Sequence, residues 1–337
     1  MLKIDMFNHL LPIKFFERMN EINPGMPDIV KRMRGIPSLT DMDLRLQQLE
    51  EFGDDYRQIV SMAMPPPELV GTPEDSAELC RIANDEMAKI VEMDDRFIGF
   101  IAAVPMDNEE AIAPEIDHAI SGLGAVGVQV FTNVKGKALD QPQFLPLFER
   151  MAHYDLPIWV HPTRVATHPD YMGEERSWYE IWWTFGWPYE TSAMMARLIY
   201  SGLMDKFPDL KVITHHMGGN TPFHAGRVGP GNDQLGARTS DYDLVGIRER
   251  LKKRPLDYFK MFYGDTCTFG SLGALICGME FFGADHIVFA SDSPFDPEKG
   301  PGYIRETMRL IDSWDISDED RQKIYQDNAV RLLKLSI

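Results

Sequence analysis

The sequence has 337 residues, of which 44% are hydrophobic and 26% charged, and its formal net charge is -18. A chain this acidic offers no basic stripe to neutralise phosphates, so we expect no nucleic-acid partner. No apolar run reaches the roughly 20 residues that cross a bilayer, and the first residues lack a signal-peptide pattern, so we expect no membrane partner. Three widely spaced cysteines, Cys80, Cys267 and Cys277, are expected to be thiols, which favours the reducing cytoplasm.

Short apolar runs alternate with amphipathic stretches along most of the chain. The runs that have the composition of buried strands are 2–7, 56–64, 97–104, 126–131, 157–161, 211–216, 259–263 and 286–291. The stretches with helical spacing of apolar residues are 13–19, 40–51, 76–93, 109–120, 144–154, 191–206 and 317–333. Eight strand candidates, most of them separated by helical stretches, in a chain of this length predict an α/β fold of the (β/α)8 TIM-barrel type.

A doubly wound open sheet is the structural alternative to the barrel. It is disfavoured because no Gly-x-Gly-x-x-Gly sequence follows an early strand. We see no linker or repeat, so we expect a single barrel domain over residues 1–337, with loop insertions around 165–188 and 218–255.

Two of the predicted strands end on histidine and are followed at once by proline or glycine. His161 closes Pro-Ile-Trp-Val-His-Pro, and His215 and His216 close Val-Ile-Thr-His-His-Met-Gly-Gly. A lone histidine in such a place is usually packed in a loop and bonded to backbone, but several strand-end groups on one rim favour a metal site. Because side chains alternate along a strand, we expect only one of His215 and His216 to face the barrel. The glycine pair after them favours His216.

Two carboxylates also lie in or directly after predicted strands. Asp292 ends the last predicted strand, where a turn aspartate is the ordinary interpretation, but histidines on the same rim favour a ligand or proton-transfer role. Asp5, Phe7 and His9 share one face of the first strand, with His9 nearest the mouth. For Asp5 we keep the structural interpretation, in which a buried carboxylate pairs with a neighbouring strand.

Aromatic and basic residues near these motifs are candidates for binding substrate. Trp178 and Trp182 belong to a tryptophan-rich loop that could equally be plain core or the wall of a pocket for a planar ligand. Arg164, Arg176 and Arg227 are the arginines closest in sequence, and surface exposure is the ordinary alternative for each of them.

Taken together, Ile-Asp-x-Phe-x-His, Pro-Ile-Trp-Val-His-Pro, Phe-Pro-Asp-Leu-Lys-Val-Ile-Thr-His-His-Met-Gly-Gly and Ser-Asp-Ser-Pro-Phe resemble the amidohydrolase superfamily. The resemblance covers almost the whole chain and is to the branch of aminocarboxymuconate-semialdehyde decarboxylase. It implies a barrel of the metal-dependent hydrolase type with one divalent metal, zinc in the first place and manganese as the alternative. It also implies a homodimer or a dimer-based oligomer.

The resemblance assigns roles by position. It implies that His9, His161 and Asp292 bind the metal, that His216 is the acid/base histidine, and that Arg227 binds a substrate carboxylate, in some relatives across the dimer interface. Phe7 stands where that family has the first histidine of an opening pair, or a glutamate, so three protein ligands and an open position are expected.

The leading hypothesis is a metal-dependent lyase that decarboxylates a hydroxylated aromatic or muconate-like acid. His216 and Asp292 would be catalytic, and Arg227, Arg164, Trp178 and Trp182 would bind the small carboxylate substrate. A hydrolase or hydratase on the same scaffold is the first alternative. A metal-free protein that binds a small acid is the second.

Overall fold

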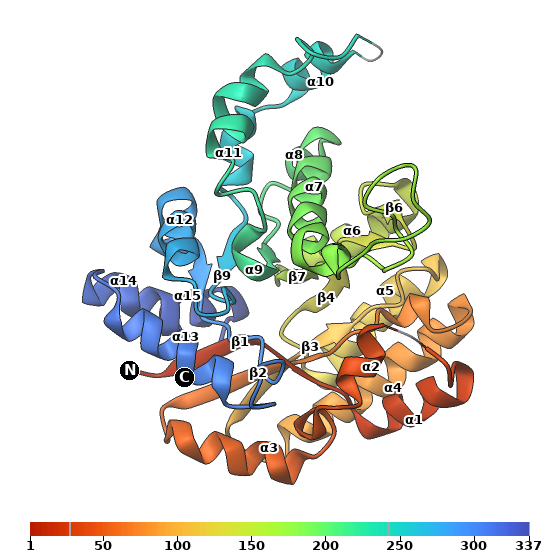
Figure 1. Ribbon diagram of the computed structural model, residues 1–337, viewed down its shortest axis with the longest axis vertical. Coiled ribbons are helices and arrows are strands. Elements are labelled where there is room, and N and C mark those ends of the chain that lie inside the picture. Colours follow the sequence, from red (N-terminus) through yellow and green to blue (C-terminus); the bar gives the residue numbers. More distant parts are fainter. Residues whose placement is uncertain (27, 241–242, 337) are drawn as a thin grey trace.

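The computed structural model describes residues 1–26, 28–240 and 243–336 (Figure 1). In these residues eight strands form one parallel sheet in the order of the chain. The strands are β1 (Lys3–Leu10), β2 (Tyr56–Met62), β3 (Phe97–Ala103), β4 (Val128–Phe131), β7 (Ile158–His161), β8 (Val212–Thr214), β9 (Tyr263–Asp265) and β10 (Ile287–Val288). A separate hairpin, β5 (Asn133–Val134) with β6 (Lys137–Ala138), follows β4.

The sheet closes on itself between its first and last strands. The chain that leaves β10 runs beside β1, where Met6 N–H donates to the Phe289 carbonyl at 2.8 Å and Asp292 N–H donates to the Phe7 carbonyl at 3.0 Å. His9 N–H donates in the same way to the Ser293 carbonyl at 2.7 Å. The predicted (β/α)8 barrel is therefore confirmed.

Helices surround the barrel and connect its strands. They are α1 (Ile13–Ile22), α2 (Ile29–Met33), α3 (Met42–Leu49), α4 (Pro73–Val91), α5 (Glu109–Asp117), α6 (Leu145–Tyr154), α7 (Trp187–Tyr200), α8 (Leu203–Lys206), α9 (His215–Gly218), α10 (Leu244–Arg250), α11 (Pro255–Phe259), α12 (Leu272–Phe282), α13 (Gly302–Ser313), α14 (Asp318–Gln322) and α15 (Asn328–Leu333). Every predicted helical stretch overlaps at least one of them. The helices that were not predicted are α2, α9, α10, α11, α12 and α13.

The interior of the barrel is a packed core. Side chains of Ile59, Ile101, Trp159 and Ile213 meet there, with residues of α15 below them. The Trp159 indole N–H donates to the Met6 carbonyl at 3.1 Å, so a side chain from β7 reaches β1, which is not its neighbour in the sheet. A filled interior leaves the carboxyl ends of the strands as the place for a site.

Several predicted strand boundaries are wrong: β1 runs three residues beyond the expected 2–7, β10 ends at Val288 and not at 291, the sixth strand is shorter than expected and the seventh lies later. The seventh strand was expected at 259–263, but Pro255 starts α11, which runs to Phe259, and the strand begins only at Tyr263. Proline is favoured at the first position of a helix, so Pro255 favours a helix over a strand here. The sixth strand was expected to include both histidines, but β8 ends at Thr214.

The two predicted insertions form distinct features. Residues 162–181 run as an irregular loop over the strand ends, and the segment that contains α10 and α11 extends away from the barrel as an arm (Figure 1). Positions 241 and 242 of the second insertion lie outside the described residues. No helix in the described part of the chain is both long and apolar enough to span a bilayer.

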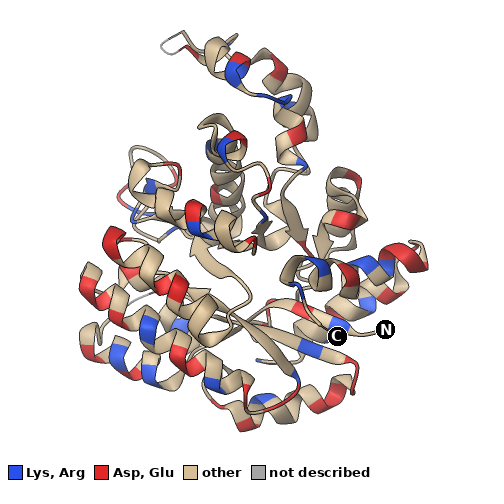
Figure 2. Ribbon diagram, turned by 180° about the vertical axis from the view of Figure 1, so that it is seen from behind, with Lys and Arg blue, Asp and Glu red and all other residues tan. Residues whose placement is uncertain are grey.

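Charged residues of both signs are mixed over the outer helices (Figure 2). A few carboxyl groups are instead fully enclosed. Glu68, in the turn after β2, is 1% exposed, and neither of its carboxyl oxygens has a hydrogen-bond partner among the described residues. Burial raises the pKa of this carboxyl to about 8, with Asp107 raising it further and Lys135 opposing the change.

Glu68→Gln is expected to stabilise the fold at alkaline pH. The folded chain keeps the Glu68 proton up to about pH 8, whereas the unfolded chain releases it near the ordinary pKa of 4.5, so this group lowers stability as the pH rises between these values. At about 1.4 kcal/mol per unit of pKa difference, the loss reaches a few kcal/mol. Chemical unfolding of both proteins at pH 5 and pH 9 should show the gain only at pH 9. An equal effect at both pH values, or the same gain in the paired carboxylate variant Glu115→Gln, would contradict it.

Candidate metal centre and active site

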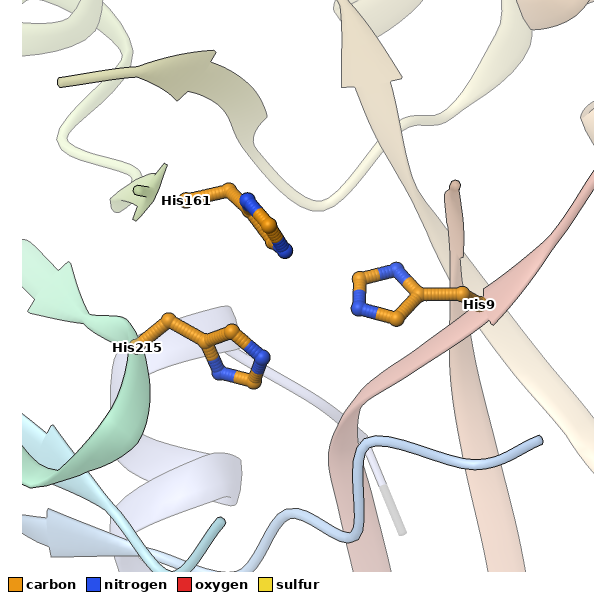
Figure 3. A group of neighbouring side chains, drawn as sticks. All are labelled: His9, His161 and His215. Carbon is orange, nitrogen blue, oxygen red and sulfur yellow. The ribbon is translucent and has the colours of Figure 1, made fainter. Parts of the chain in front are cut away.

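The imidazoles of three strand-end histidines converge at the mouth of the barrel (Figure 3). His9 lies near the end of β1, His161 is the last residue of β7, and His215 directly follows β8. One possible ligand atom of each lies within 4.8 Å of those of the other two, and all three residues are buried. Parallel strands that end on one rim bring these distant parts of the chain together.

A hydrogen bond at Nδ1 fixes the orientation of each of these rings. His9 Nδ1 lies 2.9 Å from Ser61 Oγ, and His161 Nδ1 lies 2.7 Å from the Pro162 carbonyl oxygen. His215 Nδ1 bonds to the carboxylate of Asp265, the last residue of β9. With Nδ1 engaged, Nε2 is the nitrogen left to bind something else.

Asp292 supplies a carboxylate to the same cluster. Its Oδ1 lies 3.1 Å from His9 Nε2 and 3.2 Å from His215 Nε2, and its Oδ2 lies 3.8 Å from His216 Nε2. The residue has φ 62°, a left-handed conformation that aspartate tolerates better than most side chains, and its N–H is bonded to Phe7. The backbone after β10 thereby turns the carboxylate toward the histidines.

The expectation that only one of His215 and His216 faces the site is wrong. The strand ends before them, and His216 (φ 56°) and Met217 (φ 52°) adopt left-handed conformations that make a tight turn. Both rings consequently contact Asp292, with their centroids 3.9 Å apart. Gly219 completes the turn at φ +62°, where a Cβ would lie 2.4 Å from the Pro188 carbonyl oxygen.

The electrostatics favour neutral imidazoles at His9, His161 and His216 and a protonated imidazole at His215, all around one carboxylate. Burial lowers the pKa values of His9, His161 and His216. Burial opposes ionisation of Asp292, but the neighbouring imidazoles of His215, His216 and His9 hold the pKa of this carboxyl well below its usual range. Burial would likewise lower the pKa of His215, yet the Asp265 and Asp292 carboxylates raise it to about 9. Neutral imidazole and ionised carboxylate are the forms that bind divalent metals.

His9 provides a direct test of whether this cluster suits a metal. Its Nε2 is buried and, although Asp292 is near, it makes no hydrogen bond of acceptable geometry with any described residue. An orphaned imidazole nitrogen beside other nitrogen and carboxylate donors fits a zinc or manganese ion.

A cavity of about 530 Å³ opens from this cluster. His161 and Asp292 form part of its wall, and most of the rest is aromatic. The aromatic lining residues are Trp178, Tyr179, Trp182, Trp183, Trp187, Phe269, Phe295 and Tyr303. A pocket of this size and lining suits a planar apolar ligand with a few polar groups.

Two of the predicted substrate-binding residues, Trp178 and Trp182, line this cavity. Arg164 does not: it lies in a second cavity, where its guanidinium is 3.3 Å from Glu190. Arg227 is exposed at the start of the arm, outside the lining of the cavity.

The cations that do line the cavity are Lys31, Arg32 and Arg176. Arg176 belongs to the tryptophan-rich loop and is one of the three arginines that the sequence places near the motifs. Lys31 and Arg32 belong to α2, whose sequence carries no signal that would place it over the barrel mouth. Arg32 bonds to the Phe295 carbonyl, and its guanidinium carbon is 5.9 Å from the centre of the Phe295 ring.

Asp5 follows the structural interpretation. The Tyr56 hydroxyl of β2 donates to its carboxylate at 2.5 Å, and Ser291 N–H donates at 3.0 Å. Asp265 was not predicted as part of the site. Like His161, Asp265 is the last residue of a strand, and this position could have identified it as a candidate. It was missed because the seventh strand was expected at 259–263, which ends before Asp265.

Comparison with known proteins agrees with this geometry. The sequence model of the amidohydrolase family (Amidohydrolase) matches residues 4–335. The chain belongs to the amidohydrolase family.

Two relatives within this amidohydrolase family illustrate the match. The chain is 31% identical to gamma-resorcylate decarboxylase of Polaromonas sp. JS666, over 87% of each chain. It is 29% identical to 2-amino-3-carboxymuconate-6-semialdehyde decarboxylase of Dictyostelium discoideum, over 88% of this chain and 77% of the relative. A solved structure of the Polaromonas dihydroxybenzoic acid decarboxylase, with bound manganese and the inhibitor 2-nitroresorcinol, has a TM-score of 0.79 at 28% identity. The matched region covers 100% of this chain and 98% of the chain in that structure.

Proposed function

We propose that this amidohydrolase is a metal-dependent carboxy-lyase that removes carbon dioxide from a hydroxylated aromatic acid without oxidation. The observation that carries the proposal is the cluster of His9, His161 and Asp292, which opens directly into an aromatic cavity. The relatives named decarboxylases support this reaction class.

We assign the metal to His9, His161 and Asp292. When bound there, a divalent ion supplies Lewis-acid stabilisation and a template for the carboxylate and the neighbouring hydroxyl of a substrate. We retain zinc as the proposed ion because imidazole donors suit it, with manganese as the alternative that the Polaromonas structure supports.

Side chains of the protein carry out the proton transfer and the exclusion of water. Loss of carbon dioxide leaves the electron pair of the broken C–C bond on the ring carbon, which must take up one proton. His216 Nε2 and Asp292 Oδ2, 3.8 Å apart, are the groups placed to hold that proton and pass it to the ring carbon. The wall formed by Trp178, Trp182 and Trp187 excludes water from the ring plane.

Arg32 is the cation that we assign to an anionic group of the substrate. It lines the cavity beside Phe295, whose ring centroid is 5.7 Å from that of His9. Arg227 can reach a cavity only from another subunit, as the resemblance implies for some relatives, so its role depends on a dimer.

Arg32→Gln is expected to raise KM about 10-fold or more with a smaller change in kcat. A hydrogen bond to a charged group contributes about 1.5–3 kcal/mol, and this one is made with the bound substrate before any bond breaks. Steady-state kinetics of Arg32→Gln and Arg227→Gln compare the two arginines directly. A larger effect of Arg227→Gln would transfer the role to Arg227 and make the dimer part of the site.

A homodimer is also part of the proposal. Large aromatic side chains are exposed on the loop and next to the arm, including Tyr179 (92%) and Phe223 (81%). Large exposed aromatic side chains support an interface with a second subunit. We retain the cytoplasm as the proposed location, because two of the three free thiols, Cys80 and Cys267, are buried, as expected for core residues in a reducing compartment. We also propose that residues 1–337 form a single barrel domain.

A screen for carbon dioxide release tests the proposed reaction. The purified chain, loaded with zinc or with manganese, is incubated with mono- and dihydroxybenzoates and with a muconate-type acid, and products are identified by NMR. We expect one class of acid to lose its carboxylate and gain a ring proton from solvent. Cleavage of an ester, amide or C–C bond without carbon dioxide release would replace the proposal with a hydrolase.

A further inference from the structure

Phe7 occupies the floor of the metal centre. It is fully buried, and its ring centroid lies 4.1 Å from that of His215, 5.0 Å from that of His9 and 6.1 Å from that of His161. A phenyl ring has no lone pair to give a metal. The side chain therefore fills space among the donors without adding to them, and His9, His161 and Asp292 alone would leave the ion with three protein ligands.

His215 is placed to be the fourth donor. Its imidazole is fully buried within the same cluster, where one ring nitrogen lies within 4.8 Å of nitrogens of His9 and His161. Its Nε2 and the Nε2 of His9 approach the same carboxylate oxygen of Asp292, at 3.2 and 3.1 Å. Three imidazole nitrogens and one carboxylate are donors that zinc and manganese both accept, and a fifth coordination position would remain for the substrate.

The surroundings of His215 are those of a metal-binding imidazole. Asp265 accepts a bond from Nδ1, so Nε2, which lies 3.2 Å from Asp292 Oδ1, is the nitrogen that a metal would bind in place of a proton. Backbone N–H groups of Met217 and Cys267 donate to the other oxygen of this carboxylate at 3.2 and 3.1 Å, so its orientation is also fixed. A carboxylate that holds the outer nitrogen of a ligating histidine is a recurrent feature of zinc sites.

His216 differs on each of these points. Neither of its ring nitrogens has a hydrogen-bond acceptor of good geometry in the described part of the chain, and its side chain is 14% exposed. It lines an adjoining apolar cavity, which shares Phe269 and Trp187 with the first. The two adjacent histidines thus have different environments, one anchored in the cluster and one free to exchange a proton.

We propose that His215, oriented by Asp265, is a ligand of the metal and supplies the donor that Phe7 cannot. The inference rests on the proposed function, because it concerns the same metal. It predicts a centre with three imidazoles from His9, His161 and His215, in which the residue at position 7 has been released from coordination.

X-ray absorption at the metal edge of the zinc-loaded protein tests this directly, because it counts imidazole ligands without any assay of activity. We expect three imidazoles in the unaltered chain and two in His215→Gln, which keeps much of the side-chain volume. Competition with a chelator should show that zinc affinity falls about 10- to 100-fold in Asp265→Asn, and further in His215→Gln. His216→Gln, altered at the neighbouring position, should keep both the count and the affinity.

Phe7→His in the His215→Gln background is the decisive variant. If His215 replaces a donor at position 7, the double variant should regain the third imidazole and most of the affinity lost in His215→Gln. Two imidazoles in the unaltered chain, or unchanged affinity in His215→Gln, would overturn the inference and leave the decarboxylase proposal intact. Absence of any bound zinc or manganese in the unaltered chain would overturn both.

Discussion

Asp292→Asn is expected to lower kcat/KM for decarboxylation by about 10³-fold or more and to remove most of the bound metal. Among the described residues, this carboxylate is the one anionic group that contacts His9, His215 and His216 together. Asparagine keeps the size of the side chain and loses its charge, so both the affinity for a cation and the capacity to carry the catalytic proton disappear. Steady-state kinetics with elemental analysis of the same preparation measure the two losses.

A matched control lies four residues further along the same loop. Asp296 is buried, but its carboxylate bonds to the N–H groups of Glu298 and Gly300 and not to the histidines. Asp296→Asn should therefore keep the metal, whatever its effect on stability. Equal metal retention in Asp292→Asn and Asp296→Asn would remove Asp292 from the ligand set.

His216→Gln is expected to lower kcat about 10²- to 10⁴-fold while the metal content stays near that of the unaltered chain. The His216 imidazole lies 3.8 Å from Asp292, and its centroid is 5.2 Å from that of the Phe269 ring, at the edge of the aromatic wall. In the described part of the chain it makes none of the Nδ1 hydrogen bonds found at His9, His161 and His215. Loss of a proton carrier slows the step that protonates the ring without releasing the ion.

The pairing of kinetics with metal content separates this role from ligation. His224→Gln, a change at a histidine on the segment that leads into the arm, serves as the control and should alter neither quantity. If His216→Gln lost its metal along with its activity, His216 would belong to the ligand set and the division between the two adjacent histidines would be wrong.

The fold and the central donors could be predicted because they depend on short local patterns. An apolar strand followed by a turn residue can be read directly from Trp159-Val160-His161-Pro162, and parallel strands place such ends on one rim. The same reasoning found His9 and Asp292, although the structure reaches Asp292 through a left-handed residue and not through a regular strand end.

The errors arose where tertiary structure overrides local rules. Alternation along a strand could not place His215 and His216, because the strand stops at Thr214 and two left-handed residues turn both rings to one side. Arg32 was missed for another reason. It belongs to α2, a helix of five residues whose position over the mouth depends on packing with segments far away in the sequence.

The central claim is that a divalent ion at the strand ends is required for decarboxylation, and a metal titration tests it most directly. The chain is stripped with a chelator, and zinc or manganese is added back in steps while carbon dioxide release from an accepted aromatic acid is followed. We predict that the stripped chain is inactive and that activity rises in proportion to added metal until about one ion per chain is bound. Full activity in the stripped chain, or no activity at any metal content with any of the acids, would contradict the account.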